Sequence, residues 1–183
     1  LAISSAASDV YKRQVWMREQ GYFRIPNTDH YFSQAKRYGI PESEALGLVH
    51  DFNQTGALGY IPAFKDSVEY VTRLAREGWR FDVVTMIGKD KYAHRLRKIN
   101  LQHLFGDVFD EIYCSGDFTK SKRGVLEKYK DTNYVWIDDR VDYCRDGDAV
   151  GLKTFCMDWP YNRDYKGNRV KSWKELYDTT FKC

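Results

Sequence analysis

Short runs of large apolar residues alternate with longer amphipathic stretches over most of this chain. A short apolar run rich in β-branched and aromatic residues is typical of a buried strand, whereas apolar residues at helical spacing indicate an amphipathic helix. The strand pattern occurs at residues 81–86, 109–114, 134–138 and 152–157. The helical pattern occurs at residues 64–75, 89–98, 121–129 and 172–177, with a short helix or turn at 140–145. Strands that alternate with helices predict an α/β fold, a Rossmann-like parallel sheet with helices on both faces.

Residues 15–59 have a different, mostly polar pattern without a strand. The polar residues 27–29 offer N-caps for a helix that continues through Ala35, and Pro41 begins a second helix that ends before Gly56. We therefore expect a small helical cap segment at 15–59, followed by an α/β core at 60–183.

The composition is that of one ordinary globular domain. Of 183 residues, 43% are hydrophobic and 30% charged, and the formal net charge is +3. The interspersed charges form no basic stripe, so a nucleic-acid partner is not expected, and the mild positive charge would tolerate a small anionic substrate. No apolar run has the length of a membrane span, and the sequence predicts no oligomeric state. The cysteines fit neither a Cys-x-x-Cys metal site nor a disulfide framework, which favours a reducing cytoplasm; they are Cys114, Cys144, Cys156 and Cys183.

The first fourteen residues are expected to be foreign to the natural protein. Residues 4–14 match, one for one, the translation of a common transposase-based sequencing adaptor. A natural polar leader is the alternative, but the segment lacks the basic-then-apolar order of a signal peptide. We therefore expect the authentic chain to begin at about Val15, with its natural start missing.

Two adjacent carboxylates follow the strand pattern at 134–138. Asp138 and Asp139 are expected at the carboxyl edge of the sheet, where ligands bind in open α/β folds. Neighbouring carboxylates repel each other unless a cation lies between them, and their hard oxygen atoms suit Mg²⁺. The pair is therefore the candidate metal site.

Two further groups are predicted at the same edge. Thr85 lies near the end of its strand, and its hydroxyl can hold a phosphate oxygen. Lys122 enters the helix at 121–129 and places a positive charge nearby. A hydroxyl, an ammonium group and paired carboxylates suit a phosphoryl group with Mg²⁺. Backbone N–H groups that can also bind the phosphoryl oxygens belong to Met86, Ile87 and Gly88.

In this order, the run 83–85, Lys122 at a helix start and the run 137–139 resemble the second, third and fourth motifs of the haloacid dehalogenase (HAD) superfamily of phosphohydrolases. The resemblance covers about residues 60–157. It implies that Thr85 binds the transferring phosphoryl group, which Lys122 neutralises. It also implies that the first Asp of the pair ligates Mg²⁺ directly, and that the second assists the metal or orients the lysine.

A looser resemblance extends the comparison toward the C-terminus. Residues 157–163, with Ser172-Trp173 beyond them, resemble the 5′(3′)-deoxyribonucleotidase-like branch of the superfamily. The resemblance implies a small phosphorylated substrate, with a nucleoside monophosphate favoured, and makes Asn162 a candidate substrate contact.

The nucleophile of this superfamily is an aspartate in an Asp-x-Asp motif, on a central strand that precedes the cap. The chain departs from that pattern, because Asp9 is followed two residues later by Tyr11. We expect a parent enzyme that hydrolyses a phosphomonoester, and a chain that as written is truncated, inactive and without its central strand. Such a chain would leave two unpaired ladders, so poor solubility or a molten state is expected for residues 15–183. The alternative is a catalytically dead HAD-like domain that binds a phosphorylated ligand or a protein partner.

Each candidate also has a simpler structural interpretation. The Asp pair can cap the following helix, and Thr85 can be only a β-favouring residue. Lys122 can be a surface lysine of a basic run, in which Lys120 is the other candidate for the site. The occurrence of all three features in order favours the phosphate site. The run 146–148, Asp-Gly-Asp, is expected to form a turn.

Overall fold

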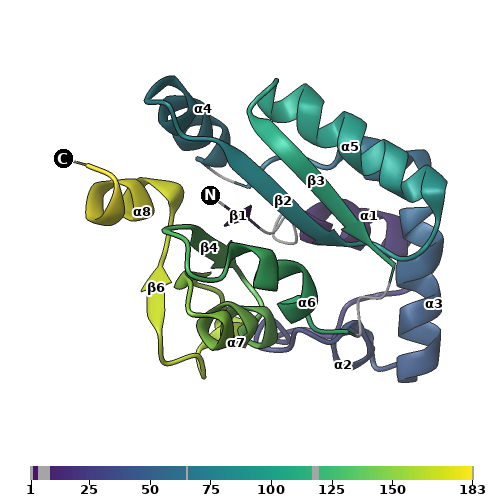
Figure 1. Ribbon diagram of the computed structural model, residues 1–183. Helices are drawn as coiled ribbons and strands as arrows, with labels where there is room; N and C mark the ends of the chain where they lie inside the picture. The colour runs from purple at the N-terminus through teal and green to yellow at the C-terminus, as the bar shows by residue number, and fades with distance from the viewer. Residues whose placement is uncertain (1, 4–8, 65, 117–119, 183) are drawn as a thin grey trace.

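A parallel sheet forms the centre of the molecule (Figure 1). The computed structural model describes residues 2–3, 9–64, 66–116 and 120–182. Within these ranges six strands occur in the order β3-β2-β1-β4-β5-β6, and all neighbours are parallel. The predicted parallel α/β sheet is therefore confirmed. The strands are β1 (Ala2–Ile3), β2 (Phe81–Met86), β3 (Phe109–Ser115), β4 (Val135–Asp138), β5 (Lys153–Met157) and β6 (Asn168–Val170).

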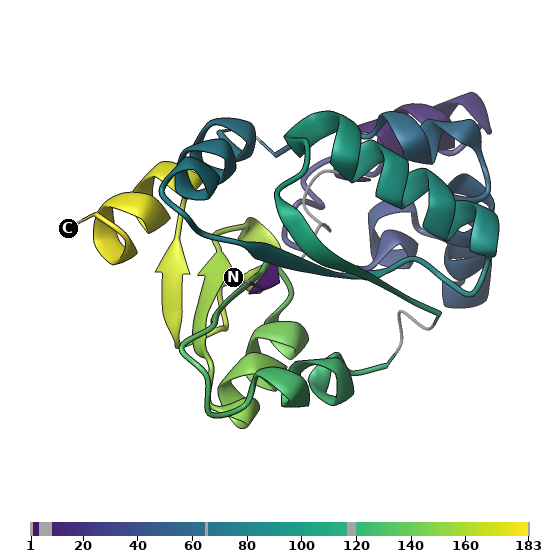
Figure 2. The same cartoon turned by 45° about the horizontal axis from the view of Figure 1, so that its top comes forward.

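Helices cover both faces of this sheet (Figure 2). Side chains alternate between the two faces along a strand, so neighbouring apolar residues of β2 and β4 enter different cores. Val83 and Ile137 pack against one helical layer, whereas Val84 and Trp136 pack against the other. The first layer consists of α4 (Ser67–Arg76), α5 (Lys91–Phe105) and α8 (Trp173–Thr180). The second consists of α6 (Arg123–Leu126), η3 (Glu127–Tyr129) and α7 (Val141–Val150).

The central position of the sheet is occupied by the two-residue strand β1. Ala2 pairs with Asp82 and Trp136, and Ile3 pairs with Val83 and Ile137. The expectation that the central strand is absent is therefore wrong. Backbone groups of β2 and β4 need partners, and a short extended segment supplies them. The segment expected to be foreign, residues 1–14, thus contributes β1 and the beginning of α1 (Asp9–Glu19), while residues 4–8 lie outside the described ranges.

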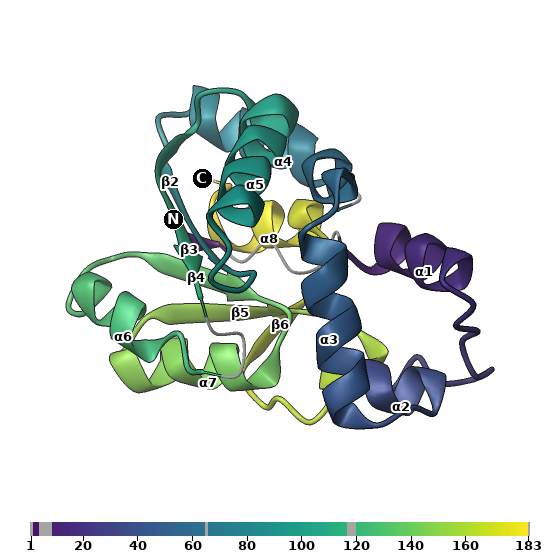
Figure 3. The same ribbon diagram turned by 90° about the vertical axis from the view of Figure 1, so that its right-hand side faces the viewer.

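The stretch 15–59 is helical, as its pattern predicts (Figure 3). Phe52 and Leu58 pack against Ile87 and Ala93, so this stretch is anchored beyond the carboxyl end of β2. One boundary differs from the prediction: the first helix after α1 begins at residue 34 and is capped by Ser33, whose Oγ accepts a hydrogen bond from the Lys36 backbone N–H. The elements after α1 are α2 (Gln34–Tyr38), α3 (Glu42–Asn53) and η2 (Gly56–Tyr60).

Several elements of the core differ from their predicted extent. The strand β6 has no counterpart in the prediction, and α5 continues to Phe105. The expected turn at residues 146–148 is wrong, because these residues lie inside α7. Gly147 is needed there for close packing: a Cβ atom on it would lie 2.4 Å from Cδ1 of Trp136. In the described ranges, no helix is both long and apolar enough to cross a bilayer.

Candidate functional site

A buried ion pair lies at the carboxyl end of β4. The Lys122 ammonium contacts Oδ2 of Asp138 at 2.8 Å, and the two side chains are 1% and 0% exposed. Lys122 also lies over the rings of Tyr143 and Trp136, at 4.4 and 5.1 Å from their centroids. These aromatic faces favour the cation but do not neutralise it, so Asp138 provides the charge that makes its burial possible.

The structure distinguishes the two candidate lysines. Lys122 is buried, whereas Lys120 is exposed to solvent. Asp146 fixes the start of α6, because its Oδ2 accepts the Lys122 backbone N–H at 2.7 Å and its Oδ1 accepts the Ser121 hydroxyl at 2.7 Å. The preference for Lys122 in the sequence is therefore consistent with the geometry, and α7 supplies the anchor that orients this lysine.

The other oxygen of Asp138 holds the turn that leaves β4. Its Oδ1 accepts the backbone N–H groups of Asp139 and Arg140, at 2.7 and 2.9 Å. Both carboxylate oxygens of Asp138 are therefore engaged, one by the lysine and one by the chain. Asp138 does not cap α7, because its carboxylate accepts N–H groups of the two residues ahead of the helix, and no side-chain capping hydrogen bond forms at the N-cap residue Arg140.

Asp139 has a different environment. It is 3% exposed, and its Oδ2 accepts the hydroxyl hydrogen of Tyr161. Burial, followed by the charge of Asp138, raises the pKa of Asp139 to about 7. Within the described residues, no hydrogen bond engages its Oδ1. Asp138 forms an ion pair with Lys122, whereas no ion pair of the described residues compensates the charge of the buried Asp139 carboxylate.

Thr85 lies at the same edge of the sheet. Val83 and Ile137 both pair with Ile3, so Thr85 and Asp139, each two residues further along, reach about the same level. Two inter-strand spacings separate them, or about 10 Å. Thr85 is 4% exposed. The residues that the sequence places after Ile3 are Ser4-Ser5-Ala6-Ala7-Ser8, which include no carboxylate.

The backbone donors predicted after Thr85 are only partly available. The N–H of Ile87 donates to the carbonyl of Ser115 at 3.2 Å and cannot also bind a phosphoryl oxygen, which corrects that part of the prediction. The Ile87 carbonyl accepts from Asn53, and the Gly88 carbonyl contacts the His94 ring, so the cap and α5 fix this turn. Gly88 has a φ of +92°, a conformation that favours glycine.

Asn162, the predicted substrate contact, is 0% exposed and fully engaged. Its Nδ2 donates to the carbonyls of Asp139 and Met157, both at 2.7 Å. Its Oδ1 accepts from Trp159 N–H at 3.0 Å and from Arg169 at 2.8 Å. The side chain therefore holds the loop after β5 against the end of β4. A direct contact with substrate would require one of these bonds to break.

The carboxylate pair fits a magnesium ion by its charge and its oxygen donors. If both carboxylates are ionised, Lys122 neutralises only one of them, and a divalent cation would offset the remaining charge. Over the described residues, no group of three His, Cys, Asp or Glu side chains could enclose a metal. Mg²⁺ is commonly held by one or two carboxylates with water and substrate oxygens, so two aspartates are sufficient. Asp138 holds the lysine, so the Asp139 oxygen that the Tyr161 hydroxyl does not contact would be available to the ion.

Residues of the cap surround Tyr161 and were not identified from the sequence. The Phe32 ring meets the Tyr161 ring edge-on at 5.4 Å, and the Arg37 guanidinium lies 5.7 Å from the same centroid. Arg140 lies 4.7 Å from the Phe32 ring. The signal that was available is the aromatic cluster at residues 159–161, but its partners in the cap are more than a hundred residues away in sequence.

Comparisons with known proteins identify the fold. No family model matches the sequence, and a search of curated proteins finds no match. Protein Tyrosine Kinase A of Mycobacterium tuberculosis has a TM-score of 0.66 at 17% identity, with 97% of this chain and 96% of that chain covered. A haloacid dehalogenase-like hydrolase of Streptococcus pneumoniae has a TM-score of 0.62 at 14% identity, with 97% of both chains covered. A D,D-heptose 1.7-bisphosphate phosphatase of B. bronchiseptica, complexed with magnesium and phosphate, has a TM-score of 0.50 at 12% identity and covers 64% of this chain and 82% of its own. These similarities establish an HAD-like Rossmann-type fold.

Proposed function

We propose that the carboxyl edge of this sheet is the phosphoryl- and magnesium-binding site of an HAD-type phosphomonoester hydrolase. The observation that carries the proposal is the buried Lys122–Asp138 pair at 2.8 Å. Beside it lies a second buried carboxylate, Asp139, whose pKa is raised by burial and by the charge of Asp138. A structural ion pair needs no second buried carboxylate next to it, because that carboxylate adds repulsion. Lys122 would neutralise charge on the phosphoryl group, and the Thr85 hydroxyl would hold one of its oxygens.

Asp139, with Asp138 beside it, would hold Mg²⁺. The ion would supply positive charge for the phosphoryl oxygens. The magnesium and phosphate bound to the heptose bisphosphatase of the same fold support this assignment. The favoured substrate is a small phosphorylated molecule, with a nucleoside monophosphate as the specific candidate from the sequence.

Hydrolysis by this mechanism requires a nucleophile, and the sequence ahead of the cap offers no Asp-x-Asp. We therefore expect the chain as written to bind its ligand without turning it over. The rival is a catalytically dead HAD-like domain that binds a phosphorylated ligand or a protein partner. The source DNA upstream of the Val15 codon distinguishes them. If it encodes, in frame, a hydrophobic β-strand that ends in Asp-x-Asp, the hydrolase is supported. If it encodes a β-strand without those carboxylates, the rival is supported.

Ligand binding tests the site itself. Isothermal titration of the full chain with inorganic phosphate, with and without Mg²⁺, should show that each ligand raises the affinity for the other. Thr85→Val keeps the shape of the side chain but removes the hydroxyl, so phosphate affinity should fall about tenfold while the fold is retained. Thr179→Val is the matched control, because Thr179 is an exposed residue of α8. Phosphate binding that is independent of both Mg²⁺ and Thr85 would refute the proposal.

A further inference from the structure

Arg37, in α2, is a buried cation to which the described part of the chain offers no ion-pair partner. The residue is 4% exposed, and its Nε donates to the carbonyl of Tyr31 at 2.6 Å. Within the ranges that the structure describes, no carboxylate lies within ion-pair distance of its guanidinium. The carboxylate of Asp29 contributes to its electrostatic surroundings but pairs with Arg24 instead.

The surroundings of Arg37 disfavour its charge. Burial, followed by the charge of Arg24, lowers the pKa of the Arg37 guanidinium. An arginine has five N–H donors, and the described contacts use only the one on Nε. The Tyr161 ring, at 5.7 Å, offers a cation–π contact that offsets part of the desolvation but satisfies none of the remaining donors. A purely structural role would be served better by a neutral side chain of similar shape.

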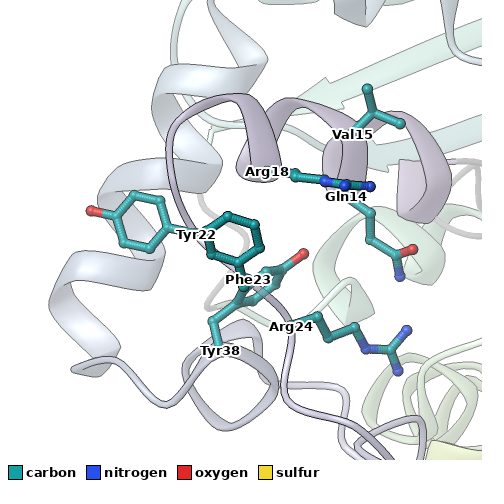
Figure 4. A pocket seen from close by; sticks show the side chains of 7 residues that line it. All are labelled: Gln14, Val15, Arg18, Tyr22, Phe23, Arg24 and Tyr38. Atoms are coloured by element: carbon teal, nitrogen blue, oxygen red, sulfur yellow. The ribbon is translucent and has the colours of Figure 1, made fainter.

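The location of Arg37 connects the cap to the proposed metal site. The ring under its guanidinium belongs to Tyr161, whose hydroxyl donates to Asp139. On its other side, the Arg37 carbonyl accepts the N–H of Ile25 at 2.8 Å, next to Arg24. Arg24 lines a cleft of about 310 Å³, in which Arg18 and Arg24 extend along opposite sides (Figure 4). Arg37 therefore links the segment that lines the cleft to the aromatic ring that contacts Asp139.

We propose that Arg37 is a substrate-binding residue of the cap, and that it holds an anionic group of the substrate other than the phosphoryl group at Thr85 and Lys122. The inference rests on the proposed function and narrows its substrate class to phosphomonoesters that carry a second anionic group. A carboxylate or a second phosphate would accept the unused guanidinium N–H groups and compensate the buried charge.

Two ligands that differ only in the second anionic group test this assignment. Ethyl phosphate carries a methyl group where 2-phosphoglycolate carries a carboxylate, and the full chain can be titrated with each in the presence of Mg²⁺. We expect 2-phosphoglycolate to bind at least about tenfold more tightly. Arg37→Gln should reduce that preference to less than about twofold, leave the affinity for ethyl phosphate unchanged, and be rescued in part by Arg37→Lys. Arg95→Gln, at an exposed position of α5, is the matched control and should keep the preference.

The melting temperature without ligand distinguishes a binding role from a structural one. Removal of an uncompensated buried charge should leave the melting temperature of Arg37→Gln unchanged or raise it. Equal affinities of the natural chain for the two ligands would overturn the inference, and so would a preference that survives Arg37→Gln. A lower melting temperature of Arg37→Gln, together with an equal loss of affinity for both ligands, would also overturn it. If Thr85→Val leaves the affinity for ethyl phosphate intact, the proposed phosphoryl site fails while the Arg37 comparison still stands. If neither ligand binds, both proposals fail.

Discussion

Replacement of Lys122 by methionine removes the cation of the buried pair and keeps most of its apolar stem. The Asp138 carboxylate, 0% exposed, would then retain two backbone N–H donors but lose its ammonium partner at 2.8 Å. Breaking a buried pair from one side costs about 3–5 kcal/mol, because the remaining charge stays desolvated. Loss of the contacts with the Tyr143 and Trp136 rings adds to this cost.

A double-mutant cycle isolates the pair from these other contacts. Asp138→Asn in the Lys122→Met background removes the stranded charge, so the double variant should recover at least about 2 kcal/mol relative to the sum of the single changes. Urea unfolding followed by tryptophan fluorescence gives the free energies, provided that the m-values agree. The control is Arg123→Met, which breaks an exposed pair with Glu127 and should cost less than about 1 kcal/mol.

The cycle can refute the geometry on which the proposed site depends. A cost below about 1 kcal/mol for Lys122→Met would mean that the lysine is solvated rather than buried. A coupling energy near zero would mean that Lys122 and Asp138 are not partners. Either result would remove the observation that carries the proposed function, whatever ligands the chain binds.

Two further changes test the environment of the site. At about pH 8 without Mg²⁺, Asp139→Asn should stabilise the chain by on the order of 1–3 kcal/mol and abolish stabilisation by Mg²⁺. The sign follows from the raised pKa of Asp139: the stability of the natural chain should fall as the pH rises from the ordinary 3.8 toward about 7. The variant lacks this carboxylate, so its stability should depend less on pH over that range. An unchanged slope would contradict the buried, ionisable state assigned to Asp139. Gly147→Ala places a Cβ 2.4 Å from Trp136 and should lower the free energy of unfolding by about 1–3 kcal/mol. The control is Gly47→Ala in α3, where the added Cβ meets nothing within 4 Å and should raise that free energy by up to about 1 kcal/mol. Equal effects of the two changes in thermal unfolding would show that α7 does not pack as described.

Four of the strands, β2 to β5, were predictable because burial on both faces imposes long apolar runs. The run at 134–138 and the following carboxylates could be placed at the sheet edge from the sequence pattern alone. The strand β6 (Asn168–Val170) was missed because only one of its three residues is buried. The Asp-Gly-Asp run at 146–148 was misread because composition alone favours a turn there. Close packing of Trp136 against the backbone of Gly147, in the space that a Cβ would occupy, overrides that preference.

The cap side of the site could not be predicted in the same way. Phe32 and Arg37 belong to a loop and a five-residue helix whose local sequence carries no periodic signal of burial. They meet Tyr161 only because the chain returns to the end of β4 after β5. The burial of Arg37 is a tertiary property, and a single arginine in a polar stretch is most often a solvated one.

The division of roles between Asp138 and Asp139 follows from a rule that the sequence already contained. Side chains alternate along a strand, so Asp138 shares a face with Trp136, two residues before it. Lys122 lies on that face, as its contacts with both residues show. Asp138 is therefore the partner of the lysine, and Asp139 turns away from it, toward Tyr161. With Lys122 on the Trp136 face, we propose Asp139 as the main carboxylate for Mg²⁺, because of the two adjacent aspartates it is Asp139 that has an oxygen engaged by no hydrogen bond of the described residues.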